Sequence, residues 1–353
     1  MAGPRADAWA VLSTPLQPKR QRGGRCESPL MSLLICSLLL SLAAKAQQPD
    51  LAVVQKVAGT VGFYTHAGKF LTAVKVGDHP HEAVLSPDKR LLYVTDNGIL
   101  WMTYKGEGGN TISIVDVKTR KKVGVIDLGS SRRPHGIDLD PKTGRLVATT
   151  ENPSGLVLVD PATRKVLRRY DVKGEAPHMV RLSPDARIAY VSNTNSGTLA
   201  AVNLETGEAK TIPTGARPQG TAFSRDQKTM YVTNSEANTI SIVDIDKFQV
   251  TGTIQTGKWP CRLAVTPDGK SLVYALQTSE AVGFADLASM KEVKQVPLGG
   301  KLLSLTLSSD GRYAYSSAQE QDKIFVISLA ERKQVRAIET PKGSGPDPVI
   351  DLR

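Results

Sequence analysis

Four of the five histidines in this chain fall at two positions of a repeated sequence pattern. His81, His135 and His178 each follow a proline, and His79 precedes the first of these prolines. A neutral imidazole is a common metal ligand and also a general base near neutral pH. Three imidazoles at equivalent positions therefore predict a shared site that binds a ligand, holds a metal ion or moves a proton.

Other polar residues occupy the corresponding positions of the remaining repeats. The residue directly after the opening turn of each repeat is, in chain order, His81, His135, His178, Gln219, Cys261, Ser304 and Asp347. Arginines lie close to several of these positions, and the planar guanidinium group matches a carboxylate or a phosphate. We therefore expect a binding site for a small anionic ligand, composed of His81, His135, His178, Arg133, Arg217, Gln219, Arg262 and Asp347.

Two other interpretations of the histidines stay open. His81, His135 and His178 would hold a divalent metal if the repeats bring all three within the Zn–N bond length of ~2.0–2.1 Å of one ion. Alternatively, the proline–histidine pair is inherited from repeat to repeat, and each ring bonds a neighbouring turn. The residues assign no catalytic role, and apart from this metal they predict no cofactor.

Glycines at near-equal spacing define the repeat. They are 41 to 52 residues apart and lie at Gly77, Gly129, Gly174, Gly215, Gly257, Gly299 and Gly343. Within each repeat, short β-branched runs alternate with turn clusters such as Ser183-Pro-Asp-Ala186, which is typical of antiparallel strands. Four strands in about 42 residues correspond to one blade of a β-propeller.

The two ends of the chain complement one another. Six full repeats run from Gly77 to Gly343, and residues 343–353 supply only the opening strand of a seventh. Residues 51–76 match the other three strands. We therefore predict an all-β, seven-bladed propeller of four-stranded antiparallel blades. Its last blade is closed by the N- and C-terminal strands, which leaves no blade edge unpaired.

The first 46 residues differ from the rest. Basic side chains precede an apolar run from Leu30 to Leu42 that ends in Ala44-Lys-Ala46, the order of a secretory signal peptide. Either Met1 or Met31 is the initiator. We expect residues 1–46 to be removed and residues 47–353 to form a single propeller domain, periplasmic or secreted and monomeric. No later stretch has the ~20 apolar residues of a spanning helix, so no transmembrane span remains after cleavage.

The charge of the chain argues against a nucleic-acid partner. Removing six basic and two acidic residues with the leader lowers the formal charge from +11 to +7. Such a modest excess does not indicate a dedicated nucleic-acid face. A small anionic ligand or a protein is the expected partner.

An insertion between Asn97 and Gly109 makes the first full repeat longer than the others. It contains Trp101, Met102 and Tyr104, and tryptophan and tyrosine are frequent anchors of protein interfaces. Loops on a rigid scaffold often carry function. We expect these three residues to form a partner-binding loop. The alternative is that Trp101 and Met102 fold back onto the edge of the blade.

Tyr231-Val-Thr-Asn234, with its near copy Tyr190-Val-Ser-Asn193, resembles the consensus of the YVTN family of β-propeller repeat proteins. The Gly-x-x-Pro openings and the Ile-Val-Asp strands extend this resemblance over residues 51–353. The wider set of such proteins is similar to lactonase-like propellers and to the haem d1 domain of cytochrome cd1 nitrite reductase. The resemblance implies an exported propeller.

No catalytic motif accompanies the repeat. The sequence has no Gly-x-Ser-x-Gly, Walker, Cys-x-x-Cys-His or His-Glu-x-x-His pattern. Two repeats, at Tyr274-Ala-Leu-Gln277 and Tyr315-Ser-Ser-Ala318, also lose the consensus asparagine. We therefore favour a non-catalytic scaffold that binds a ligand or a protein at the channel mouth. The resemblance leaves two alternatives: a lactone hydrolase with a His/Arg or metal site at that mouth, and a haem d1- or quinone-associated cofactor protein.

Overall fold

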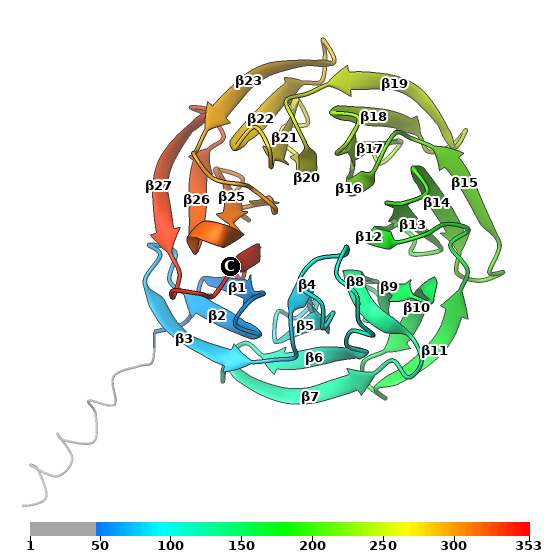
Figure 1. Ribbon diagram of the computed structural model, residues 1–353, viewed down its shortest axis with the longest axis vertical. Coiled ribbons are helices and arrows are strands. Elements are labelled where there is room, and N and C mark those ends of the chain that lie inside the picture. The colour runs from blue at the N-terminus through cyan, green and yellow to red at the C-terminus, as the bar shows by residue number, and fades with distance from the viewer. Residues whose placement is uncertain (1–46) are drawn as a thin grey trace, which may run out of the picture. The chain divides into compact units, whose positions relative to one another are not determined.

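The computed structural model describes residues 47–353, which form seven four-stranded antiparallel sheets around a central channel (Figure 1). The sheets are numbered here as blades 1 to 7. This arrangement confirms the prediction of an all-β, seven-bladed propeller. The expected signal peptide lies outside the described residues.

Blades 1 to 6 follow one another along the chain, and each begins with its innermost strand (Figure 1). Blade 1 consists of β4 (Pro80–Leu85), β5 (Leu91–Asp96), β6 (Thr111–Asp116) and β7 (Lys121–Asp127). Blade 2 consists of β8 (Arg132–Leu139), β9 (Leu146–Asn152), β10 (Ser154–Asp160) and β11 (Lys165–Tyr170). Blade 3 consists of β12 (Pro177–Leu182), β13 (Ile188–Asn193), β14 (Thr198–Asn203) and β15 (Ala209–Pro213).

The next three blades repeat this order. Blade 4 consists of β16 (Pro218–Phe223), β17 (Thr229–Asn234), β18 (Thr239–Asp244) and β19 (Gln249–Gln255). Blade 5 consists of β20 (Pro260–Val265), β21 (Ser271–Leu276), β22 (Ala281–Asp286) and β23 (Lys291–Pro297). Blade 6 consists of β24 (Thr306–Leu307), β25 (Tyr313–Ala318), the short 3₁₀ helix η1 (Gln319–Gln321), β26 (Lys323–Ser328) and β27 (Lys333–Glu339).

Blade 7 joins the two ends of the described chain. Its strand order is β28 (Pro346–Asp351), β1 (Leu51–Gln55), β2 (Thr60–Tyr64) and β3 (Phe70–Lys75). β28 pairs antiparallel with β1, with Leu51 opposite Asp351 and Val53 opposite Val349. The predicted closure by N- and C-terminal strands is therefore confirmed. It gives β1, which would otherwise be a bare edge, a hydrogen-bonded neighbour.

The hydrophobic core lies between adjacent blades. Tyr231 and Ile240 of blade 4, for example, pack against Leu272 and Leu276 of blade 5, and all four are buried. Side chains alternate between the two faces of a strand, so the middle strands of each sheet pack on both neighbouring blades. Because this packing between the blades stabilises the ring, the central channel does not need an apolar lining and can carry polar side chains.

The threonine or serine at the third position of the Tyr-Val-Thr-Asn consensus holds the channel-lining strand of the next blade in place through its hydroxyl group. The Thr95 hydroxyl donates to the carbonyl of His135 in the next blade at 2.8 Å, and the Thr149 hydroxyl donates to that of His178 at 2.8 Å. Ser192 does the same to the carbonyl of Gln219 at 2.6 Å. These bonds cross from one blade to the next. The threonine or serine of the repeat therefore positions the backbone of the predicted site residues.

The consensus asparagine and the repeat glycine form one structural unit. A Cβ atom at Gly215 would lie 2.7 Å from Cγ of Asn234, and a Cβ atom at Gly174 would lie 2.3 Å from Nδ2 of Asn193. Asn234 in turn donates to the hydroxyl groups of Thr239 and Ser241 at 3.1 and 2.9 Å. A glycine is required at this point because the asparagine side chain fills the space beside it.

In blade 5, the residue at the consensus asparagine position lies one residue earlier in the chain than the sequence pattern predicts. Tyr274–Gln277 was matched to the Tyr-Val-Thr-Asn consensus, but Pro260 pairs with Leu276 just as Pro218 pairs with Asn234 in blade 4. Leu276 therefore stands at the asparagine position. Since successive side chains point to opposite faces, the shift of one residue reverses the face that Tyr274 occupies.

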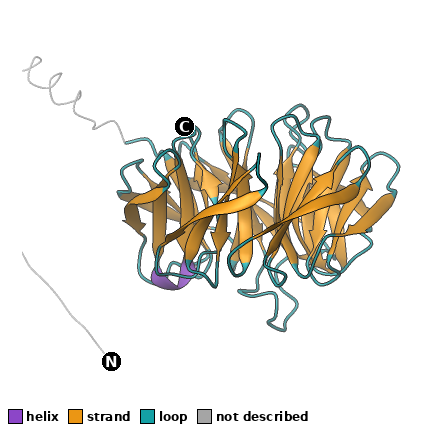
Figure 2. Cartoon of the chain, turned by 90° about the horizontal axis from the view of Figure 1, so that it is seen from above, coloured by secondary structure: helices purple, strands orange, loops and turns teal. Residues whose placement is uncertain are grey.

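Figure 2 shows the ring edge-on, with strands running between its two faces and connecting loops on both. Within the described part of the chain, no helix has the length and apolar character needed to cross a membrane.

Candidate functional site

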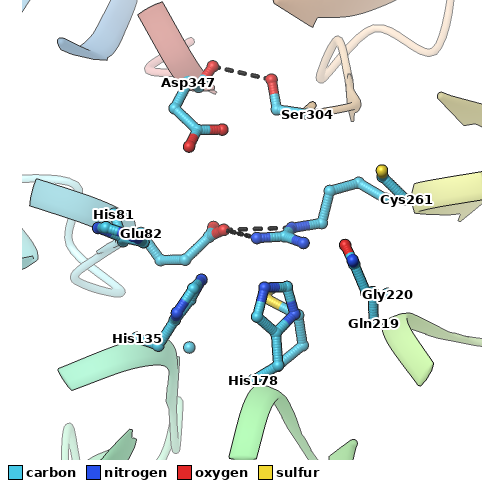
Figure 3. A network of polar contacts seen from close by, with 12 residues as sticks. His81, Glu82, His135, His178, Gln219, Gly220, Cys261, Ser304 and Asp347 are labelled. Atoms are coloured by element: carbon cyan, nitrogen blue, oxygen red, sulfur yellow. Dashed lines mark hydrogen bonds and ion pairs between the residues drawn. The ribbon is translucent and has the colours of Figure 1, made fainter. Parts of the chain in front are cut away.

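One mouth of the channel contains most of the residues predicted to bind a ligand. Seven of the eight line a single pocket of about 220 Å³: His81, His135, His178, Arg217, Gln219, Arg262 and Asp347. The innermost strands of the blades, and for Arg217 the turn before β16, bring them together around the channel, as Figure 3 shows for the labelled members. We call this the mouth pocket. Its other lining residues include Lys56, Trp101, Met102, Trp259 and Cys261.

The opening turn of the repeat places two large side chains, Arg217 and Trp259, at this mouth. The residue before the turn proline has positive φ in five of the blades, with 41° at His79, 60° at Arg217 and 61° at Trp259. Gly345 takes the same conformation in blade 7, with φ of 60°. A residue with a Cβ atom is disfavoured there by roughly 1–2 kcal/mol. Such strain is concentrated at functional sites in proteins.

The three imidazoles lie in a row, ring beside ring. The ring centroids of His81 and His135 are 4.4 Å apart, and those of His135 and His178 are 4.1 Å apart. All three side chains are buried. Nδ1 of His81 hydrogen-bonds the carbonyl of His79 at 2.8 Å, and Nδ1 of His135 hydrogen-bonds Glu151 at 2.8 Å. With Nδ1–H donating in both rings, Nε2 is left as an acceptor.

Burial keeps these imidazoles neutral. It lowers the pKa of His81, His135 and His178 well below 6.5, and the nearby positive charge of Lys56 acts in the same direction. Arg262 adds to the lowering of the pKa of His135 and His178. At neutral pH the row therefore offers uncharged nitrogen atoms as hydrogen-bond donors and acceptors.

The metal interpretation of the histidines stays a prediction. In residues 47–353, no group of three or more His, Cys, Asp or Glu side chains has an arrangement that could hold a metal ion. The imidazoles here pack against one another's rings. Their Nδ1 atoms, where bonded, face the protein.

A buried ion pair crosses the channel between blades 1 and 5. Nε of Arg262 in blade 5 donates to Oε1 of Glu82 in blade 1 at 3.1 Å, and a second guanidinium nitrogen contacts the same oxygen (Figure 3). Arg262 lines the mouth pocket and also a second cavity, which Glu82 lines as well. The pair thus lies between the two cavities. Burial lowers the pKa of Arg262, but Glu82 and Asp347 outweigh this effect, and the net pKa is raised.

A second buried pair joins Lys56 to Asp347. Nζ of Lys56 lies 3.4 Å from a carboxylate oxygen of Asp347 and 5.3 Å from the ring centroid of Trp101. Burial lowers the pKa of Lys56, and the neighbouring Asp347 opposes this change. Asp347 also accepts a bond from the Ser304 hydroxyl through its backbone carbonyl, at 2.8 Å (Figure 3).

Arg133 is the predicted ligand residue that the structure places outside the mouth pocket. Its guanidinium donates to the carbonyls of Tyr104 at 2.8 Å and Gly106 at 2.6 Å, and lies 3.5 Å from Glu151. It therefore positions the insertion in blade 1. The physical reason is the insertion in blade 1, whose backbone carbonyls bind the guanidinium group.

The insertion reaches the channel. Trp101 and Met102 line the mouth pocket, so they do not simply cover the edge of their own blade. Tyr104 is 55% exposed and does not line the pocket. The loop thus contributes two of its three predicted residues to the wall of the pocket and leaves the third in solvent.

Arg217 is the one arginine of the mouth pocket whose charge is not matched within the described residues. It takes part in none of the ion pairs found there. Its guanidinium carbon lies 5.8 Å from the ring centroid of Trp259. Nε of Arg217 and Nδ1 of His178 are buried without a hydrogen-bond partner in residues 47–353.

Sequence reasoning missed three charged or aromatic residues of this site. Glu82 carried a signal, because it stands in blade 1 where Arg262 stands in blade 5, one residue after the predicted site position. Trp259 lies before the turn proline, as Arg217 does. Lys56 follows β1, which is not an innermost strand, so the repeat gave no signal for it.

Comparisons with known proteins agree with the geometry. A family model described as "Lactonase, 7-bladed beta-propeller" matches residues 129–290, which confirms the resemblance to lactonase-like propellers. No curated protein matches the chain.

Several solved structures are similar in fold. One is a functionally unknown protein from Desulfotomaculum acetoxidans, at 15% identity and TM-score 0.72, covering 86% of this chain and 98% of that one. Another is Kuenenia stuttgartiensis hydrazine synthase, at 17% identity and TM-score 0.63, covering 74% and 86%. A third is the dihydro-haem d1 dehydrogenase NirN in complex with DHE, at 15% identity and TM-score 0.61, covering 85% and 67%. At such identities the likeness concerns the fold alone.

Proposed function

We propose that this protein is a non-catalytic scaffold that binds a small carboxylate in the mouth pocket. The observation that carries the proposal is the unmatched charge of Arg217. Lys56 is paired with Asp347, and Arg262 is paired with Glu82. The three imidazoles are neutral. The positive charge that remains for a ligand is therefore that of Arg217.

The shape and lining of the pocket narrow the class of ligand. A volume of about 220 Å³ lies below the ~300–1,000 Å³ typical of sites for drug-sized molecules. Trp101 and Trp259 supply aromatic faces, and the imidazole row supplies hydrogen-bonding nitrogens. A small aromatic carboxylate suits these features. Its carboxylate pairs with the guanidinium of Arg217, and its aromatic ring packs against the tryptophans.

Binding of named carboxylates to full-length protein tests the proposal. The probes are benzoate, nicotinate and indole-3-acetate, each compared with its neutral methyl ester by isothermal titration calorimetry. We expect at least one acid to bind, its ester to bind more weakly, and Arg217→Gln to weaken the acid about tenfold or more. The matched control is Arg187→Gln, which removes an arginine that is exposed on the surface.

Two results would overturn this function. One is the absence of binding by all three acids. The other is equal affinity for the acid in Arg217→Gln and in the control Arg187→Gln. Binding would then not depend on the unmatched guanidinium of Arg217.

The family-model match favours one second candidate, hydrolysis of a lactone in the same pocket. The neutral imidazole of His178 would take a proton from water as the water oxygen attacks the lactone carbonyl, and Arg217 would stabilise the resulting oxyanion. Collapse of this intermediate would break the ring C–O bond, and the imidazolium would return its proton to the leaving alkoxide, which gives the open-chain hydroxy acid. Proton release from δ-valerolactone and glucono-δ-lactone, followed by pH-stat, measures this activity. Hydrolysis that His178→Gln abolishes would replace the non-catalytic proposal.

A further inference from the structure

The channel has a second cavity on the other side of the Glu82–Arg262 pair. Its volume is about 330 Å³, and we call it the far cavity. Four buried apolar side chains from different blades form much of its wall: Ile137, Met179, Leu263 and Leu305. Arg181 of blade 3 and Thr221 of blade 4 also line it. None of these residues lines the mouth pocket.

The polar groups of the far cavity are incompletely paired. Thr221 is only 4% exposed, yet its hydroxyl has no hydrogen-bond partner in the part of the chain that the structure describes. A buried hydroxyl without a partner costs about 1–3 kcal/mol, so a ligand that bonds it is favoured. Arg181 likewise takes part in none of the ion pairs found among residues 47–353.

The carboxylates of the far cavity are already occupied. Glu82 is held by Arg262, and Asp351 accepts bonds from Nε and Nη2 of Arg353 at 3.0 and 2.6 Å. Neither forms an ion pair with Arg181, which acts on Glu82 only as a nearby positive charge that opposes the rise in the pKa of this carboxyl on burial. A cavity with apolar walls, an unmatched guanidinium and an unpaired hydroxyl has the chemistry of an amphipathic anion site.

We infer that the far cavity is a second binding site, for a small monocarboxylate with a hydrocarbon tail. The carboxylate pairs with Arg181 and accepts the hydroxyl hydrogen of Thr221. The tail packs against Ile137, Met179 and Leu263. The site is separate from the mouth pocket and does not depend on the function proposed there.

Titration of full-length protein with octanoate tests this site, with 1-octanol as the uncharged counterpart. We expect octanoate to bind with a stoichiometry of one and 1-octanol to bind at least tenfold more weakly. Arg181→Gln should weaken octanoate at least tenfold, and Thr221→Val should weaken it severalfold. The matched control is Arg225→Gln, which removes an exposed arginine that does not line the far cavity.

The variants also separate the two sites. Octanoate binding that is lost in Arg217→Gln but kept in Arg181→Gln would place the fatty acid in the mouth pocket and overturn the inference, as would the absence of binding at millimolar octanoate. Benzoate, nicotinate and indole-3-acetate titrated into Arg181→Gln report on the mouth pocket separately. Urea unfolding of each variant, together with the milder Thr221→Val, distinguishes a lost site from a lost fold.

Discussion

Glu82 and Arg262 occupy the same position in two blades that are not neighbours, and their side chains meet across the channel. Each is the third residue of its innermost strand, in β4 and β20. Blades 6 and 7 separate them around the ring. Because the partners are 180 residues apart in sequence, their contact depends on correct closure of the whole propeller.

Removing one partner of this pair should destabilise the protein strongly. Glu82→Gln leaves the guanidinium of Arg262 buried without the carboxylate that directly contacts it, and we expect the free energy of unfolding to fall by about 3–5 kcal/mol. The double substitution Glu82→Met with Arg262→Met removes both charges and should recover most of this loss. Urea unfolding measures both. The control is Glu208→Gln, at an exposed pair, and an equally small effect of Glu82→Gln would contradict the prediction.

Stability should fall on mild acidification because of the imidazole row. The pKa of each buried histidine is lower in the folded than in the unfolded state, so below pH 6.5 the unfolded chain binds more protons. The free energy of unfolding then decreases as pH falls, by up to about 1.4 kcal/mol per pH unit for each imidazole. Unfolding in urea at pH 7.5, 6.5 and 5.5 measures the slope.

His178→Gln is the matched variant for this pH dependence. Burial raises the pKa of Glu82 and Glu151, which acts in the opposite sense, so the informative quantity is the difference between wild type and variant. We expect a shallower loss of stability between pH 6.5 and 5.5 in His178→Gln. Equal slopes would mean that His178 is not held neutral in the folded protein.

Gly215→Ala tests the pairing of glycine with the consensus asparagine. The new methyl group would overlap Asn234, and we expect a loss of about 1–3 kcal/mol in the free energy of unfolding. Gly252→Ala is the control, since its Cβ atom would meet only the flexible end of Ile242, at 3.3 Å. Thermal unfolding compares the two. Similar melting temperatures would show that Asn234 does not determine the need for glycine.

The fold was predictable because the same pattern of glycine, turn and strand residues recurs in every repeat. Seven equivalent glycines set the blade count, and the terminal segments could only complete one another. The alignment was wrong in blade 5, because Tyr274 lies one residue after the position that corresponds to the consensus tyrosine. Successive side chains of a strand point to opposite faces of the sheet. An alignment error of one residue therefore assigns every side chain of the strand to the wrong face, although the residue types matched remain similar.

The candidate site was predictable only where it followed the repeat. His81, His135, His178, Gln219 and Asp347 share one position, and the structure brings them to one pocket. The contact between Glu82 and Arg262 crosses the ring, and no local pattern encodes a partner on the opposite side. The place of Arg133 outside the mouth pocket could not be predicted for a related reason: its carbonyl partners belong to an insertion that no other repeat contains.

The pairing of β28 with β1 means that the ring cannot close until β28 has been synthesised. A ribosome produces Leu51 first and its partner Asp351 only after nearly all of the intervening chain. Until then, β1 presents an unpaired edge, and the nascent molecule has no closed circle of blades. A protease that removed residues 346–351 before they pair would leave β1 as an exposed strand edge, open to pairing with other chains, so β28 keeps the ring closed.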